Sequence, residues 1–192
     1  RLADFRQALA AQRAIPPATV KVLRAAAERR LPAMDTLFLA AGTLNLDLAN
    51  ADPQRQAMAG LARFPVIVAT YARLLNGQAP LAPRADLAHA ANYLFMLFGE
   101  DPEPERVRAL ETYLNTVVDH GLNASTFTAR VITSTGSDLI SALVGAIGAL
   151  KGPLHGGAPG PALDMVFEIG EASRAESFMR QKLERHERLM GF

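Results

Sequence analysis

At residues 151–158 the chain reads Lys-Gly-Pro-Leu-His-Gly-Gly-Ala. Pro153 fixes its own φ and keeps the residue before it out of a helix. The two glycines that follow His155 allow a ligand to lie close to their backbone. The apolar run at residues 162–167 predicts a helix that begins just after this segment. A helix N-terminus carries positive potential, which favours a neutral imidazole that can donate one hydrogen bond to a substrate oxygen. His155 is therefore a candidate catalytic residue, and the alternative is that it belongs to an ordinary turn.

The rest of the chain is predicted to be all-α, because its apolar residues recur at helical spacing and no run alternates with a period of two. Prolines and glycines separate the helices. The first predicted helices begin near residue 2, after Pro16 and after Pro32, and the later ones occupy residues 53–75, 86–98, 105–119, 125–135, 139–150 and 175–189. The many small side chains favour close helix packing, either within one helical domain or across a dimer interface.

Local signals sharpen some of these helices. Asp52 before a proline is typical of an N-cap, and Pro65 is predicted to kink or split the helix that follows. Either Asn123 or Ser125 is predicted to cap the helix at 125–135. The helix at 105–119 is amphipathic, with a predicted buried side made of Val107, Leu110, Leu114 and Val117.

Composition excludes several classes of function. The chain has 192 residues, a formal net charge of +1 and no cysteine, so we expect no nucleic-acid partner, no disulfide and no thiolate chemistry. We find no signal peptide and no apolar run long enough to span a bilayer, and we expect no membrane partner. The glycines match neither a Walker nor a Rossmann pattern. Because the chain opens on arginine, we expect it to be part of a longer polypeptide.

The four histidines are not equivalent. His89 is predicted to lie in the middle of a helix as a packed residue, and His186 to lie on a charged, solvated helix face. His120 follows an amphipathic helix at a break, where it either presents a nitrogen to a pocket or caps the last carbonyls of the helix. Asp119 is its neighbour, but no further ligand stands at helical spacing, so we predict no metal site.

Two segments resemble the citrate synthase family. Residues 120–131, His-Gly-Leu-Asn-Ala-Ser-Thr-Phe-Thr-Ala-Arg-Val, and residues 148–158, Gly-Ala-Leu-Lys-Gly-Pro-Leu-His-Gly-Gly-Ala, resemble blocks of bacterial citrate and 2-methylcitrate synthases in the same order and spacing. Weaker matches lie at residues 90–97 and at 189–192, the latter just before the family's Gly-His-Arg-Val-Tyr motif. The resemblance covers essentially the whole chain.

The resemblance implies an all-α homodimeric enzyme with a large helical domain and a smaller mobile one. It implies that acetyl-CoA condenses with oxaloacetate, in the tricarboxylic acid cycle and in the cytoplasm. Coenzyme A then enters as a thioester substrate, and no cofactor is permanently bound. In that reaction His155 matches the histidine that stabilises the enol, and His120 matches a histidine that binds the 2-oxo acid. Asn123 matches a residue that positions either the substrate or a catalytic imidazole.

The resemblance also has departures. In the family, a second catalytic histidine, an aspartate base and the arginines that hold carboxylates and coenzyme A lie beyond the segment that Phe192 matches. We therefore expect residues 1–192 to be part of the large domain, with the small domain largely or wholly absent, and to be inactive alone. Residues 159–161, Pro-Gly-Pro, stand where many relatives have Asn-Glu. The alternatives are a 2-methylcitrate synthase that uses propionyl-CoA and a non-catalytic helical dimerisation module.

Overall fold

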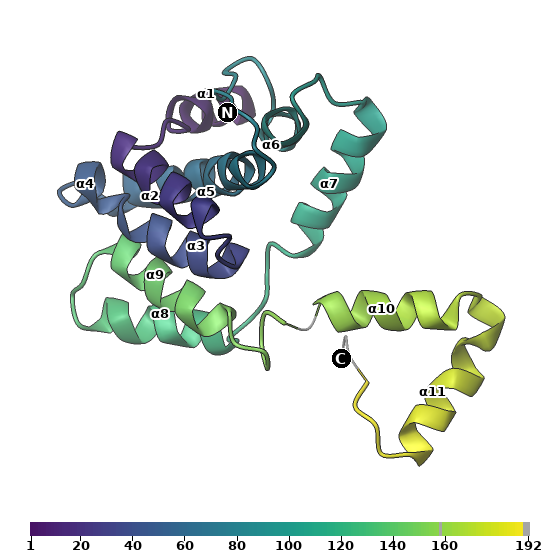
Figure 1. Ribbon diagram of the computed structural model, residues 1–192. Helices are drawn as coiled ribbons and strands as arrows, with labels where there is room; N and C mark the ends of the chain where they lie inside the picture. Colours follow the sequence, from purple (N-terminus) through teal and green to yellow (C-terminus); the bar gives the residue numbers. More distant parts are fainter. Residues whose placement is uncertain (158, 190–192) are drawn as a thin grey trace. The chain divides into compact units, whose positions relative to one another are not determined.

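The computed structural model describes residues 1–157 and 159–189, and these residues form helices and connecting segments without a strand (Figure 1). The all-α prediction is therefore confirmed. In chain order the helices are α1 (Leu2–Ala11), α2 (Pro17–Glu28), α3 (Ala33–Gly42), α4 (Asn45–Leu48), α5 (Pro53–Leu75), α6 (His89–Phe98), α7 (Pro104–Thr116), α8 (Ala124–Ser134), α9 (Leu139–Leu150), α10 (Pro159–Ile169), the 3₁₀ turn η1 (Ala172–Arg174) and α11 (Ala175–Glu184).

The chain divides into two compact units, residues 1–148 and residues 149–192. The first unit holds α1 to α8 and nearly all of α9. The second begins at the end of α9 and holds α10 and α11. The assignment of all 192 residues to one large domain stays a prediction.

Helix α5 is the centre of the first unit, where it packs against α1, α2, α3 and α6. Its N-cap is Asp52, whose Oδ1 accepts a hydrogen bond from the backbone N–H of Arg55 at 3.0 Å, as the sequence predicted. The helix continues through Pro65 as one element, so the predicted split does not occur. It stops before Gly77, whose φ of +70° lies in the left-handed region.

Among the described residues, α5 is also the one helix long and apolar enough to cross a membrane, by length and composition alone. The sequence expectation that no apolar run is long enough to span a bilayer is therefore wrong by this criterion. Half of the most apolar window is buried inside the structure. Arg63 is 5% exposed, and its two terminal nitrogens donate to the Asp47 carboxylate at 2.9 and 3.0 Å. This packing is that of the core helix of a helical domain.

The main core of the first unit joins helices that lie far apart in sequence. Its buried members are contributed by α2, α3, α4, α5, α9 and the residue before α4, and they are Leu23, Ala26, Ala40, Leu44, Leu48, Ala59, Ile67, Tyr71 and Ile140. Glycines allow α9 to approach its neighbours closely, because a Cβ at Gly145 would lie 2.1 Å from Ile132 of α8. Close packing through small residues, one of the two predicted uses, is thus confirmed here.

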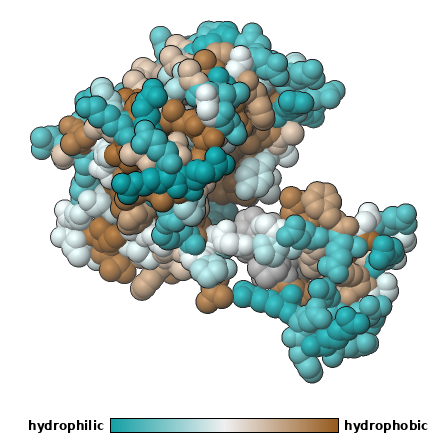
Figure 2. Space-filling view, viewed as in Figure 1, coloured by the Kyte–Doolittle hydropathy of each residue, from teal (hydrophilic) through white to brown (hydrophobic). Residues whose placement is uncertain are grey.

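The prediction that α7 buries its apolar side is wrong. None of its residues is buried, and Leu114 and the adjacent Val117 are 39% and 47% exposed. The reason is that α7 packs mainly against α6, which leaves much of its surface exposed. Figure 2 shows apolar side chains reaching the surface at several places on the molecule. Amphipathicity predicted the helix correctly but not the presence of a covering partner.

Two other helix bounds differ from the prediction. Helix α6 begins at His89 rather than at residue 86, because Arg13 donates to the carbonyl oxygen of Leu87 at 3.0 Å and holds the preceding segment in a non-helical form. Helix α11 ends at Glu184 rather than at residue 189, and His186 beyond it adopts a left-handed φ of +56°. His186 is exposed, as predicted.

Candidate active site

His155 lies in a tight turn of the second unit, between the end of α9 and the start of α10. Its backbone N–H donates to the carbonyl oxygen of Gly152 at 3.0 Å, and the N–H of Gly156 donates to the carbonyl oxygen of Leu150 at 2.8 Å. The histidine is half-buried. Helix α10 begins at Pro159, which confirms the predicted helix just after the histidine. Residue 158, the last of the quoted segment, lies outside the described residues.

The turn requires glycine at positions 156 and 157, because backbone carbonyl oxygens of the same turn lie where a Cβ would be. A Cβ at Gly156 would lie 2.1 Å from the carbonyl oxygen of Leu150, and one at Gly157 would lie 2.9 Å from that of Pro153. Real Cβ atoms essentially never come so close. On the side where a Cβ would project, the space is therefore filled by the chain, and the glycines allow the turn to close around His155.

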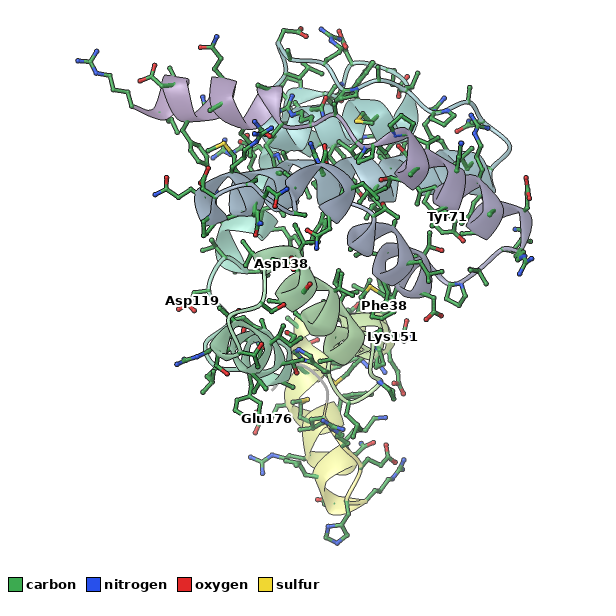
Figure 3. The ribbon with its side chains drawn as sticks, turned by 90° about the vertical axis from the view of Figure 1, so that its left-hand side faces the viewer. Phe38, Tyr71, Asp119, Asp138, Lys151 and Glu176 are labelled. Carbon is green, nitrogen blue, oxygen red and sulfur yellow. The ribbon has the colours of Figure 1, made fainter. Side chains whose placement is uncertain are left out.

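His120 lies in the first unit, on the exposed loop between α7 and α8. Helix α7 ends at Thr116, so His120 stands beyond its C-cap and the alternative of a C-cap histidine is not adopted. Gly121 has a φ of +57°, a conformation that glycine adopts at little cost. Its N–H donates to Oδ1 of Asp119 at 3.0 Å. Figure 3 shows Asp119 at the edge of the first unit.

The side chain of Asn123 ties this loop to α8. Its Oδ1 accepts hydrogen bonds from the Thr126 N–H at 3.0 Å and from the Ser125 hydroxyl at 2.7 Å, so Asn123 is the N-cap. Its Nδ2 donates to the carbonyl oxygen of His120 at 3.2 Å. One amide group therefore starts α8 and holds the backbone of the candidate histidine.

Helix α9, which leads into the His155 turn, is anchored at its start by a polar cluster. Oδ1 of Asp138 accepts from the Ser141 N–H at 2.9 Å and from the Asn45 side chain at 3.0 Å. The hydroxyl of Ser141 donates to Oδ2 at 2.7 Å. These hydrogen bonds, above all the one from the Ser141 hydroxyl, lower the pKa of Asp138 to about 2. The buried side chain of Gln56 accepts from the N–H of Leu139 at 3.0 Å. The partners of this cluster, Asn45 in α4 and Gln56 in α5, lie far from α9 in the sequence.

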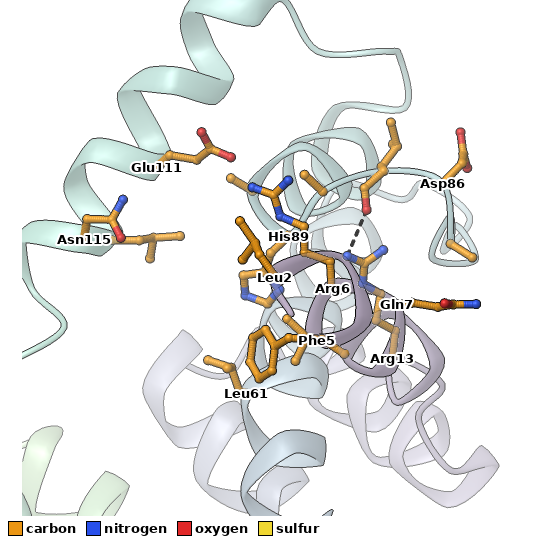
Figure 4. Close-up of a pocket in the computed structure, with 16 residues that line it drawn as sticks. Leu2, Phe5, Arg6, Gln7, Arg13, Leu61, Asp86, His89, Glu111 and Asn115 are labelled. Atoms are coloured by element: carbon orange, nitrogen blue, oxygen red, sulfur yellow. Dashed lines mark hydrogen bonds between the residues drawn. The ribbon is translucent and has the colours of Figure 1, made fainter.

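A cavity of about 620 Å³ lies among α1, α6 and α7 in the first unit (Figure 4). Its lining includes Arg13, which is 3% exposed, and His89. His89 was predicted in the middle of a helix but is the first residue of α6, because the connector before it is held by Arg13. Burial lowers the pKa of His89, and the positive charge of Arg13 lowers it further. Neither His120 nor Asn123 lines this cavity.

The structure thus places the sequence-predicted residues in two turns. Asn123 and His120 are in direct hydrogen-bonded contact in the first unit, whereas His155 belongs to the second. Within residues 1–157 and 159–189, no three side chains of His, Cys, Asp or Glu gather as a metal site would require. The arrangement therefore provides two imidazole groups, those of His120 and His155, and local hydrogen bonds fix the backbone that carries each of them.

The described chain is helical, so the protein belongs to the all-α class. Its candidate catalytic groups are the imidazoles of histidines that lie in turns next to helix ends. The family model described as "Citrate synthase, C-terminal domain" matches residues 1–192, so the chain belongs to the citrate synthase family. It is 43% identical to the citrate synthase of Deinococcus radiodurans over 195 residues, which cover 99% of this chain and 52% of that protein.

Two further similarities bear on specificity and fold. The chain is 49% identical to the 2-methylcitrate synthase of Mycobacterium tuberculosis over 137 residues, which cover 71% of this chain and 35% of that protein. A citrate synthase of Thermoplasma acidophilum, solved as a ternary complex with carboxymethyl coenzyme A and oxaloacetate, matches the fold with a TM-score of 0.80 and 25% identity. That match covers 98% of this chain and 51% of the solved one. Some relatives match this chain from end to end, and the chain spans about half of the length of those relatives.

Proposed function

We propose that the protein to which this chain belongs condenses acetyl-CoA with oxaloacetate and water to give citrate and coenzyme A. The acetyl group becomes an alkyl group on transfer, because its methyl carbon forms the new bond. Membership of the citrate synthase family supports this reaction. The observation that carries the proposal is the turn at His155, where the backbone of one half-buried histidine is fixed by the bond from Gly156 to Leu150.

The roles proposed for the histidines follow from the chemistry. The acetyl methyl proton is weakly acidic, so a base removes it effectively only when the oxygen of the thioester is stabilised at the same time. His155 donates a hydrogen bond to that oxygen as the enol forms. His120 binds oxaloacetate, whose carbonyl carbon the enol carbon attacks. Hydrolysis of the resulting thioester releases coenzyme A. An aspartate outside this chain is the proposed base.

The substrates are proposed as oxaloacetate and an acyl-CoA thioester. The Thermoplasma relative solved with oxaloacetate and a coenzyme A derivative supports both. We propose no permanently bound cofactor, a homodimer, and a cytoplasmic role in the tricarboxylic acid cycle. The exposed apolar side chains of α7 and α8, among them Tyr113, Phe127 and Val131, supply surface that a second copy would cover.

The rival reaction is 2-methylcitrate formation from propionyl-CoA, favoured by the 49% identity to the mycobacterial enzyme. The two substrates differ by one methylene, which a pocket discriminates by only about 1–3 kcal/mol. The test is to measure kcat/KM for both thioesters with the complete gene product and oxaloacetate. A value at least tenfold higher for acetyl-CoA supports the main proposal, and the reverse order supports the rival. No condensation with either thioester would instead support the non-catalytic dimerisation module.

A further inference from the structure

The peptide unit that joins His120 to Gly121 is hydrogen-bonded at both of its polar groups. The N–H of Gly121 donates to Oδ1 of Asp119 at 3.0 Å, and the carbonyl oxygen of His120 accepts from Nδ2 of Asn123 at 3.2 Å. Such a peptide plane cannot rotate without losing one of these bonds. Because rotation of the plane changes the conformation at the α-carbon of His120, the two bonds together restrict the direction in which the imidazole projects.

The loop around this peptide has little apolar packing to fix it by other means. Every residue from 117 to 122 is exposed. Gly121 adopts a left-handed φ of +57°, a turn conformation that glycine adopts without steric cost. Side-chain hydrogen bonds from the chain to its own backbone are therefore a principal source of order here.

We propose that Asp119 is a positioning residue for His120 in the condensation reaction, a role that rests on the proposed function. Asp119 acts by accepting the hydrogen bond from Gly121, not by carrying a negative charge. Asn123 holds the opposite side of the same peptide but also caps α8. Asp119 makes no such capping bond to a helix, so its substitution affects the turn while α8 keeps its cap.

The experiment compares Asp119→Ala with Asp119→Asn in the complete gene product. Asp119→Ala removes the acceptor, and we expect KM for oxaloacetate to rise about tenfold or more, because a misplaced imidazole binds the substrate poorly. Asp119→Asn keeps an acceptor oxygen and is expected to stay within about twofold of the wild type. Asp52→Ala is the matched control, since Asp52 also accepts a backbone N–H at 3.0 Å but caps α5. The control should lower Tm and leave KM unchanged.

The outcomes separate this proposal from the proposed function. An unchanged KM in Asp119→Ala, or an equal defect in Asp119→Asn, overturns the positioning role. Hydrogen–deuterium exchange of the segment that contains Gly121 gives a readout that needs no activity: exchange should accelerate in Asp119→Ala and not in Asp119→Asn. If the wild-type protein forms no citrate, the proposed function fails and the role in catalysis fails with it. The exchange result then still decides whether Asp119 orders the turn.

Discussion

The backbone N–H of Gly156 donates to the carbonyl oxygen of Leu150 at 2.8 Å, and a Cβ at residue 156 would lie 2.1 Å from that same oxygen. The hydrogen bond closes the turn that carries His155, and the steric contact restricts residue 156 to glycine. Gly156 is not among the residues with a positive φ, so close approach, rather than a left-handed backbone, sets this requirement.

We predict that Gly156→Ala lowers kcat about 100-fold, because the turn must open to admit the methyl group and the imidazole is then misplaced. Steady-state kinetics and circular dichroism of the complete gene product would measure this. Gly160→Ala is the matched control, since a Cβ at residue 160 of α10 meets nothing within 4 Å. It should preserve kcat and favour the helix by up to about 1 kcal/mol. Full activity in Gly156→Ala would show that the turn tolerates opening.

His155→Ala should lower kcat by about 100- to 1,000-fold, the usual loss when one donor to a developing oxyanion is removed. The fold should persist, because His155 is only half-buried. His186→Asn is a control in the same unit, since His186 is exposed and asparagine tolerates its left-handed φ of +56°. Unchanged turnover in His155→Ala would remove this histidine from the mechanism.

The two functions of Asn123 can be separated by substitution. Asn123→Asp keeps an oxygen that can cap α8 but loses the Nδ2 donor to the carbonyl of His120. We expect Tm to be retained, helped by the carboxylate at a helix N-terminus, and KM for oxaloacetate to rise. Asn123→Ala loses both functions and should also cost about 1 kcal/mol of stability. Calorimetry and kinetics measure the two effects, and a normal KM in Asn123→Asp would contradict the link to His120.

Helix caps were predictable from sequence because each depends on a side chain acting within a few residues. Asp52 and Asn123 accept backbone hydrogen bonds three residues ahead, and Gly99 ends α6 with a φ of +87°. These residue types near a helix end can be recognised from the neighbouring sequence alone. The candidate histidines were predicted through two segments that resemble a family, and family membership is confirmed.

Features that depend on distant residues were not predictable in this way. The start of α6 at His89 depends on Arg13, which is 74 residues from the carbonyl that it binds at Leu87. The exposure of Leu114 depends on which elements cover α7, which an apolar stripe does not specify. The glycines around His155 predict room for a ligand, whereas in the structure the carbonyl of Leu150 occupies the space beside Gly156.

The anchor of α9 should make stability depend on pH through Asp138. Its Oδ2 accepts the hydroxyl of Ser141 at 2.7 Å, and its pKa is lowered from 3.8 to about 2. Because the folded-state pKa lies below the unfolded one, the stabilisation is present above about pH 4 and is lost as the pH falls toward 2. Asp138→Asn should abolish this part of the pH dependence, and Asp138→Ala should cost about 1 kcal/mol at neutral pH. Ser141→Ala should weaken the pH dependence without removing it, since the backbone N–H of residue 141 remains as a donor. Urea unfolding at pH 2 to 7 checks these values, and a difference in the free energy of unfolding between wild type and Asp138→Asn that is constant between pH 4 and 2 would contradict the assignment.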